Sequence, residues 1–287
     1  MDLNFRKRRI YSILWLMVVV MMMIRCLPEP LDIDELPKLE PKIVVSSQII
    51  PGNGLVIFLS KSIGALDAGN DSDPEDLLQQ IAIDDAQVIL TGGEQSDTLQ
   101  NLANGLYGGI NTNWQEGRSY TLLITSPTMG SVKATTQVLS TVRFDRISAR
   151  VISNEFDSLA QINYQFTDPS EKNFYMINVQ RIRASQQLDR LINPRIYTRL
   201  LDDSEFKGQL KEETFNVLFQ EYSIGDTIAV SMANISEYYY KFLKLRNDNR
   251  FSFVEFAGEP INYPSNVKDG YGFFNLHTPD YRLFILE

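Results

Sequence analysis

The chain has 287 residues, a formal net charge of −9, a single cysteine and a single histidine. The acidic excess argues against nucleic-acid binding, because phosphate contacts need clustered lysine and arginine side chains. One cysteine allows neither an intrachain disulfide nor a cysteine-rich metal site, and the length suffices for two domains with ordinary cores.

Residues 1–25 have the form of an export signal that ends at the only cysteine. The basic stretch Arg6-Lys7-Arg8-Arg9 precedes an apolar run from Ile10 to Ile24. As a helix this run reaches roughly 22 Å, short of the roughly 30 Å hydrocarbon core of a bilayer, which favours a signal peptide over a spanning helix. We therefore predict that Cys26 is the first residue of a bacterial lipoprotein and carries acyl chains such as palmitate. An uncleaved anchor with an incidental thiol is the alternative, and Arg25 supports it, because that position is usually small and uncharged.

Residues 26–41 are predicted to form an acidic, proline-rich tether. The prolines are interspersed with acids, and such a segment buries too little apolar surface to offset the entropy of ordering it. Loss of residues 1–25, which carry five basic residues and one acid, changes the formal charge from −9 to −13. That charge argues against electrostatic adhesion to anionic lipid, so we expect membrane contact through the lipid on Cys26.

Residues 42–141 contain short β-branched runs separated by turn residues, a pattern typical of an antiparallel sandwich. The stretch Asn104-Gly105-Leu106-Tyr107 suits a tight turn that presents an aromatic residue to the core. We predict an immunoglobulin-like or transthyretin-like β-sandwich domain in a mainly β protein. The predicted strands are Lys42–Ile49, Leu55–Ser60, Ala86–Thr91, Thr98–Leu102, Ser119–Thr125 and Val132–Leu139.

An acidic stretch interrupts this domain and includes a short predicted helix, Pro74–Ile81, with Asp73 as its cap. Asp71, Asp73 and Asp76 are weak candidates for a calcium site, because hard cations prefer closely spaced carboxylate oxygens. The stretch lacks the glycine and the terminal glutamate of the calcium-loop template. A solvated acidic loop is therefore favoured, and no metal or cofactor is predicted.

Residues 142–287 are predicted to form a second β-rich (α+β) domain. The run Phe174–Ile182 alternates like a half-buried strand, and Ser236 caps a helix that ends near Arg246. The aromatic segment Phe251–Glu287 is expected to close the sheet of this domain. The other predicted elements are strands at Val142–Ile152, Leu159–Phe166, Phe215–Phe219 and Thr227–Ala233, and helical turns at Gln186–Ile192.

The predicted C-terminal helix contains Tyr238, Tyr239 and Tyr240 in succession. At about 100° per residue these side chains cover about 200° of the helix surface, so they cannot all face one core. Tyrosines that lie half on the core with their hydroxyls in water explain the run most simply. The functional alternative is a ligand- or partner-binding surface formed by these residues and Tyr271. The glycines on either side of Tyr271 indicate a close approach of two backbones or a bulge.

No catalytic set is recognisable in the sequence. His277 is the sole histidine, and no motif supplies the acid and the oxyanion hole that a serine triad would also need. We expect His277 to be structural and the protein not to be an enzyme. The abundant carboxylates leave a glycan hydrolase as an alternative, which a cleft with two acids about 5 to 10 Å apart would favour.

Several weak motifs, taken in their order along the chain, carry a resemblance to a known family. They are Lys42-Ile43-Val44-Val45, Asn104-Gly105-Leu106-Tyr107, Gly225-Asp226, Pro264-Ser265-Asn266-Val267 and Gly270-Tyr271-Gly272-Phe273-Phe274. The chain resembles the Bacteroidetes lipoproteins of domain-of-unknown-function family 4249. The resemblance implies a lipid-anchored protein of the outer membrane, with the cell surface favoured over the periplasmic face. Members of the family are often encoded beside a TonB-dependent transporter and have no assigned reaction.

The anchor, the tether and the missing catalytic sets together predict a cell-envelope protein that acts by binding. We expect it to be an accessory to a TonB-dependent transporter that assists ligand capture or uptake, although the transporter itself comes only from the family resemblance. A structural or adhesive envelope module without a transporter is the first alternative, and a glycan hydrolase is the second.

Overall fold

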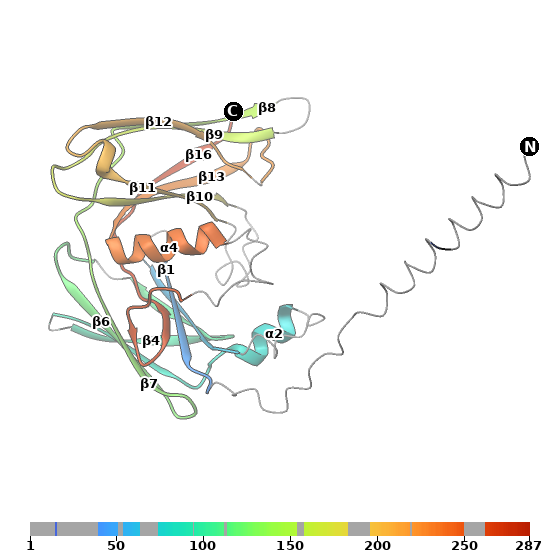
Figure 1. Ribbon diagram of the computed structural model, residues 1–287, viewed down its shortest axis with the longest axis vertical. Coiled ribbons are helices and arrows are strands. Elements are labelled where there is room, and N and C mark those ends of the chain that lie inside the picture. The colour runs from blue at the N-terminus through green and yellow to red at the C-terminus, as the bar shows by residue number, and fades with distance from the viewer. Residues whose placement is uncertain are drawn as a thin grey trace, which may run out of the picture. The chain divides into compact units, whose positions relative to one another are not determined.

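The chain divides into two compact units, residues 1–39 and residues 40–287. The second unit is mainly β, as predicted (Figure 1). The predicted signal peptide, Cys26 and the tether up to Leu39 lie outside the described residues, apart from Trp15. The computed structural model describes Trp15 and residues 40–50, 54–63, 74–93, 95–111, 114–153, 158–182, 196–218, 220–249 and 262–287.

The first half of the second unit is a β-sandwich whose two layers share one strand. Its strands are β1 (Ile43–Ile50), β2 (Gly54–Lys61), β3 (Gln87–Gly92), β4 (Gln95–Ala103), β5 (Leu106–Asn111), β6 (Ser119–Ser126), β7 (Gly130–Gln137), β14 (Val267–Lys268) and β15 (Tyr271–Phe273). The strand order is β14-β7-β6-β3-β4-β5-β2-β1-β15. Residues 95–99 of β4 pair with β3 and residues 100–103 pair with β5, so β4 passes from one layer to the other. Side chains from both layers, such as Ile57 and Leu122, fill one core.

The predicted strands of this domain are confirmed with small shifts at their ends. β3, β6 and β7 alternate buried and exposed residues, as antiparallel strands with one face on a core do. The predicted tight turn is also present, since the backbone φ is 53° at Asn104 and 74° at Gly105. Tyr107 follows, fully buried, and its hydroxyl donates to the Ile83 carbonyl at 2.9 Å and accepts from the Ala86 N–H at 3.1 Å.

The C-terminal segment corrects one prediction, because part of it completes the first sandwich rather than the second domain. β15 pairs in parallel with β1, and β14 pairs with β7. Glycines make the approach of β15 possible, as their spacing predicted. A Cβ on Gly270 would lie 2.6 Å from the Ile43 carbonyl oxygen, and a Cβ on Gly272, where φ is 90°, would lie closer still to the Val45 carbonyl oxygen.

The second half of the unit is a sandwich of two separate sheets. The sheets have the strand orders β11-β10-β13-β16 and β12-β9-β8, and an aromatic-rich core that includes Tyr164, Phe166 and Tyr175 lies between them. The strands are β8 (Arg146–Ser153), β9 (Ser158–Thr167), β10 (Phe174–Ile182), β11 (Ile196–Asp202), β12 (Leu210–Asn216), β13 (Thr227–Ile235) and β16 (Asp280–Ile285). Among the described residues of the predicted C-terminal closing segment, β16 is the strand that joins this domain.

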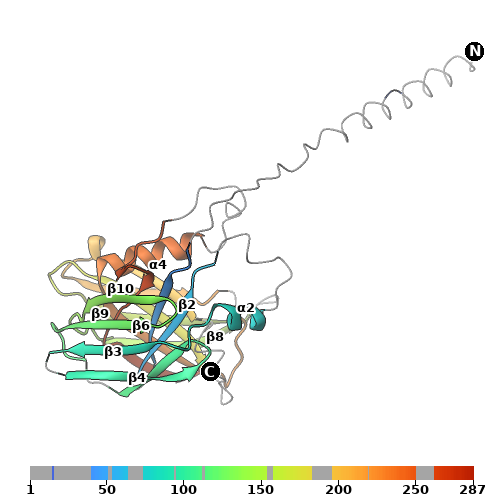
Figure 2. The same ribbon diagram turned by 90° about the horizontal axis from the view of Figure 1, so that it is seen from below.

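β10 differs from its prediction in burial rather than in position. Its predicted bounds are confirmed, but both of its faces are buried rather than one. Tyr175, Ile177 and Val179 face the aromatic core, whereas Phe174 and Met176 pack beneath α4 (Glu237–Asn249). Figures 1 and 2 show α4 lying along this second face of the sheet. Among the described residues, no helix is both long enough and apolar enough to span a bilayer.

Of the remaining predictions, two are confirmed, one is wrong in position and one lies outside the described residues. The helix α2 (Pro74–Ile81) has the predicted bounds. Ser236 caps α4 as predicted, because its hydroxyl accepts from the Tyr239 N–H at 3.2 Å. The strand predicted at Phe215–Phe219 is wrong in position, since β12 ends at Asn216. The helical turns predicted at Gln186–Ile192 lie outside the described residues.

Candidate binding site: an aromatic face on α4 and β15

Aromatic side chains from α4 and the residues before β14 form a surface around Phe273 of β15, and Tyr271 stands two residues before Phe273 on the same strand. We call this surface the aromatic face, and it consists of Tyr238, Phe242, Tyr263, Tyr271 and Phe273. Phe273 is buried at its centre, with its ring centroid 5.6 Å from that of Tyr238 and 5.3 Å from that of Phe242. Phe242 lies 6.1 Å from Tyr263 by the same measure. The surface therefore joins the second sandwich to the edge of the first.

The tyrosines of the aromatic face are exposed but fixed. Tyr238 and Tyr271 are each 48% exposed and Tyr263 is 37% exposed. The Tyr238 hydroxyl donates to the Ser265 carbonyl at 3.3 Å, and the Lys42 ammonium lies 5.3 Å from the centroid of the Tyr271 ring. Rings held in this way lose little conformational entropy when they bind, and they offer both an apolar surface and a hydroxyl.

The other two predicted tyrosines take part in packing. The Tyr239 ring stacks on Phe242, with centroids 6.0 Å apart, and burial raises the pKa of its hydroxyl. The Tyr240 ring lies 4.9 Å from that of Phe174, beneath the helix. Of the three consecutive tyrosines, only Tyr238 is classed as exposed, in agreement with the expectation that at least one cannot face the core.

Sequence reasoning missed Tyr263, Phe273 and Lys42. A signal for Phe273 was available, since residues two apart on a strand share a face and Tyr271 was already a candidate. No local pattern indicated that α4 would lie against Phe273, or that Lys42 would lie beside a residue more than 200 positions away.

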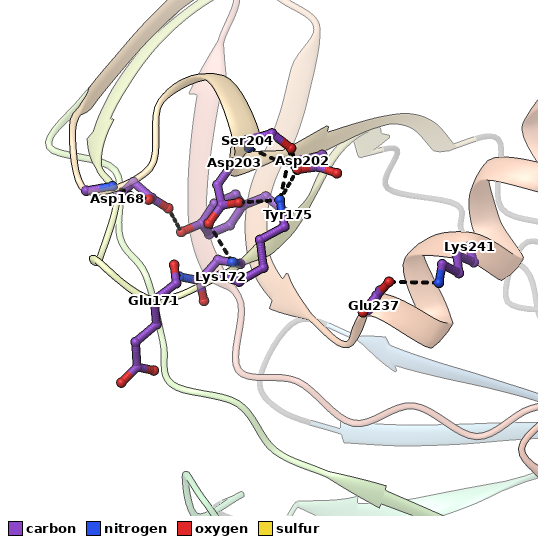
Figure 3. Close-up of polar contacts among 11 residues, drawn as sticks. Asp168, Glu171, Lys172, Tyr175, Asp202, Asp203, Ser204, Glu237 and Lys241 are labelled. Atoms are coloured by element: carbon purple, nitrogen blue, oxygen red, sulfur yellow. Dashed lines mark hydrogen bonds and ion pairs between the residues drawn. The ribbon is translucent and has the colours of Figure 1, made fainter.

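A group of buried acids lies in the second sandwich. The Tyr175 hydroxyl donates to one oxygen of Asp168, and the Gly208 N–H donates to the other at 2.8 Å. Burial first, and then the Asp168 carboxylate, raise the pKa of Tyr175. Asp203 accepts from the Asn173 N–H at 2.6 Å. These bonds tie the turn before β10 to the turn after β11 (Figure 3).

A lysine completes the same group. The Lys172 ammonium lies 2.6 Å from an Asp203 oxygen and also pairs with Asp202, the cap of the short helix η1 (Asp203–Glu205). Figure 3 shows this arrangement, with the separate Glu237–Lys241 pair of α4 at 2.7 Å. Both oxygens of Asp168 accept hydrogen bonds from the protein, whereas one oxygen of Asp203 does so and the other has only the ion pair with Lys172. We assign this group to the stability of the fold.

The metal candidates gain no support from the described residues. Asp76 is exposed on α2, whereas Asp71 and Asp73 lie outside the described residues. In the part of the chain that the structure describes, no group of His, Cys, Asp and Glu side chains has an arrangement that could hold a metal ion.

His277 is buried between β15 and β16 rather than within a strand. Its Nδ1 lies 2.9 Å from the Asn275 side-chain nitrogen, which donates to it. Burial lowers the pKa of His277 to about 4, so the ring is neutral at pH 7. This contact joins two residues, two positions apart, in the segment that connects β15 to β16.

Comparison with protein families establishes the relationship of the chain. The family described as "Domain of unknown function (DUF4249)" matches residues 29–281. The chain belongs to this family. Among solved structures, the DUF4249 chain is similar to a segment of two fibronectin type III domains from chicken tenascin, with 10% identity, coverage of 68% of this chain and 90% of that chain, and a TM-score of 0.21. Similarity at that level carries no functional information. No curated protein matches the chain significantly.

Proposed function

We propose that this DUF4249 protein is a lipid-anchored binding protein of the outer membrane. In this proposal Cys26 carries the lipid, the acidic tether gives the body its reach, and the aromatic face contacts a membrane-embedded partner. The expected partner is a TonB-dependent transporter, whose ligand capture or uptake the protein assists.

The observation that carries the proposal is the pairing of exposed tyrosines with a buried aromatic base. Protein interfaces draw most of their binding energy from a few large side chains, with tyrosine among the most frequent. Tyr238, which is 48% exposed, lies beside the buried Phe273, and Tyr271, equally exposed, stands two residues before Phe273 on β15. Such a base holds the contact residues in place before binding, which lowers the entropy lost on association.

A purification from native membranes tests the proposed partner. The tagged full chain is recovered from detergent-solubilised outer membrane, and co-purifying proteins are identified. We expect wild type to recover a TonB-dependent transporter and the double variant Tyr238→Ala, Tyr271→Ala to recover about tenfold less or lower. The control is Leu283→Ala, which removes a side chain that is 70% exposed on β16.

Two results would contradict the proposal in different ways. If wild type recovers no transporter, the transporter role is wrong, and a deletion strain with impaired attachment and normal uptake would then support the adhesive alternative. If the tyrosine variant and Leu283→Ala both recover wild-type amounts, the aromatic face is not the contact surface.

The anchor is tested separately by mass spectrometry of the protein from membranes. We expect a mature N-terminus at Cys26 that carries acyl chains, and release of the Cys26→Ser variant from the membrane fraction. A protein that retains residues 1–25 and carries no acyl chain would contradict the proposed location.

A further inference from the structure

Four lysines gather at the side of the first sandwich where the chain enters its first strand. They are Lys42, Lys61, Lys133 and Lys268, and we call this surface the basic edge. Lys42 precedes β1, and Lys61 ends β2 opposite Ile43. Lys133 of β7 lies opposite Lys268 of β14.

The β14–β15 turn lies between the strands β1 and β7, beside which these two pairs of lysines are found. A Cβ on Gly270, within this turn, would lie 2.6 Å from the Ile43 carbonyl oxygen and 3.0 Å from a methyl group of Val132. The turn therefore contacts the start of β1 and the middle of β7 at once. Tyr271 follows directly, and its ring lies under the Lys42 ammonium.

The basic edge has a local excess of positive charge. The strand ends and the turn that form it, residues 40–44, 60–62, 132–134 and 266–272, contain the four lysines and only two acids, Glu40 and Asp269. Among the described residues, none of the four lysines forms an ion pair with a carboxylate. The full chain carries a net charge of −9, so this local excess of positive charge is hidden in the total.

Two apolar groups accompany the lysines. Tyr271 is 48% exposed, and Ile63, two residues after Lys61, is 39% exposed. Exposed tyrosine and lysine together suit the headgroup level of a membrane, where the ring meets the lipid boundary and the ammonium meets phosphate.

We propose that the basic edge docks onto the anionic headgroups of the membrane that bears the lipid anchor. This inference rests on the proposed function, because the anchor brings the surface to the membrane. Glu40 is fourteen positions after Cys26, and an extended proline-rich segment reaches about 43 Å over that many steps. Lys42 follows the tether directly, so the basic edge lies at the attachment end of the body. Docking there places the neighbouring aromatic face close to a partner embedded in the same membrane.

A fluorescent label on the full chain tests the contact. Ile63→Cys is labelled with an environment-sensitive dye, and the protein is reconstituted into vesicles of phosphatidylcholine, or of phosphatidylcholine with about one third phosphatidylglycerol. We expect a blue shift of emission on the anionic vesicles that high salt removes. Leu218→Cys, which replaces a side chain that is 46% exposed in the second sandwich, serves as the label control and should show no shift.

Charge variants show whether the response to anionic vesicles depends on the position of the lysines or on the total charge of the protein. Replacement of the four lysines of the basic edge by glutamine should abolish the shift at residue 63. The matched control replaces four lysines of the second sandwich, Lys207, Lys211, Lys241 and Lys244, by glutamine and should preserve it. Equal emission on both kinds of vesicle, or an equal loss in both variants, would overturn the proposal.

Failure of the anchor is recognisable in the same experiment. An acylated Cys26 has no free thiol, so labelling of the wild-type chain reveals an unmodified cysteine. In that case sedimentation of the chain with the two vesicle types still tests the basic edge. Binding to anionic vesicles alone, lost in the variant of the basic edge, supports docking, and binding to neither contradicts it.

Discussion

The two sandwiches are closed in different ways. The first is closed by the backbone, since β4 belongs to both layers and the β14–β15 turn joins their far edges. The second consists of separate sheets that meet at two seams. At one seam β11 and β12 are joined by the Arg199–Glu213 ion pair and by stacked rings of Tyr197 and Phe215, 5.6 Å apart. At the other, the Val151 N–H of β8 donates to the carbonyl of Glu287, two residues after the end of β16, at 3.0 Å.

The cores of the two sandwiches also differ in the kind of side chain that fills them. Aliphatic side chains predominate between the layers of the first sandwich, whereas rings such as Phe166, Tyr175 and Phe206 contact one another in the second. Hydroxyl and ionic groups accompany those rings, for example where the Tyr164 hydroxyl donates to Glu213 at 2.7 Å. The first sandwich should therefore be most sensitive to backbone strain, and the second to the loss of polar partners.

The largest expected effect comes from Gly272→Ala. The backbone at Gly272 has a φ of 90°, and an added Cβ would collide with the Val45 carbonyl, so β15 must separate from β1. We expect a loss of about 4 kcal/mol in the free energy of unfolding, measured by urea denaturation. Hydrogen exchange of residues 44–46 should also accelerate.

The matched control is Gly225→Ala in the second sandwich. Gly225 has nearly the same φ, 89°, but an added Cβ would meet nothing within 4 Å. This variant should lose only about 1 kcal/mol, because it carries the backbone strain without the collision. Equal losses in the two variants would show that the close approach of β15 to β1 does not matter to stability.

The segment that links the sandwiches should respond to pH through His277. Burial lowers the pKa of His277 from 6.5 to about 4, so the unfolded chain binds the proton first as pH falls. The contribution of neutral His277 is complete above about pH 6.5 and is lost as the pH falls to about 4, which amounts to about 3 kcal/mol. The measurement is the free energy of unfolding against pH for wild type and His277→Gln.

The difference between the two proteins isolates the histidine, because every other ionisable group is the same in both. Their stabilities should converge as the pH falls from 6.5 to 4, while His277→Gln is less stable at pH 7 through lost packing. A difference that stays constant over this range would mean that the ring is hydrated and that its pKa is ordinary.

Local sequence patterns predicted most strands. They failed where the burial or the pairing of a strand depends on a segment that is distant in the sequence. The runs in residues 42–141 indicate their strands because β-branched residues favour strands and turn residues separate the runs. β10 gave no sign that α4 would cover its second face, and Tyr271 gave no sign that its strand would pair with β1. Tyr238 and Tyr271 were predicted as contact residues from their types alone, and their binding role stays a prediction.

The basic edge shows a different limit of sequence reasoning. Its lysines are spread from residue 42 to residue 268, so no window along the chain contains a basic cluster. The negative net charge conceals this local excess of lysines, and on its own it argued against contact with anionic lipid. Strand register places Lys133 beside Lys268 and Lys61 beside Ile43, and register depends on pairing that no single segment specifies.

The smallest expected effect concerns the side-chain contacts that join β11 to β12 in the second sandwich. Arg199 and Glu213 are 33% and 19% exposed, so solvent screens their attraction in part, and Arg199 also lies 5.4 Å from the Phe215 ring. A double-mutant cycle with Arg199→Gln and Glu213→Gln should give a coupling of about 1 kcal/mol that falls at high salt. The same cycle on Lys241 and Glu237, which are 60% and 58% exposed on α4, should give about 0.3 kcal/mol. If the seam pair couples no more strongly than the helix pair, ring stacking holds β11 to β12 and the ionic contact is incidental.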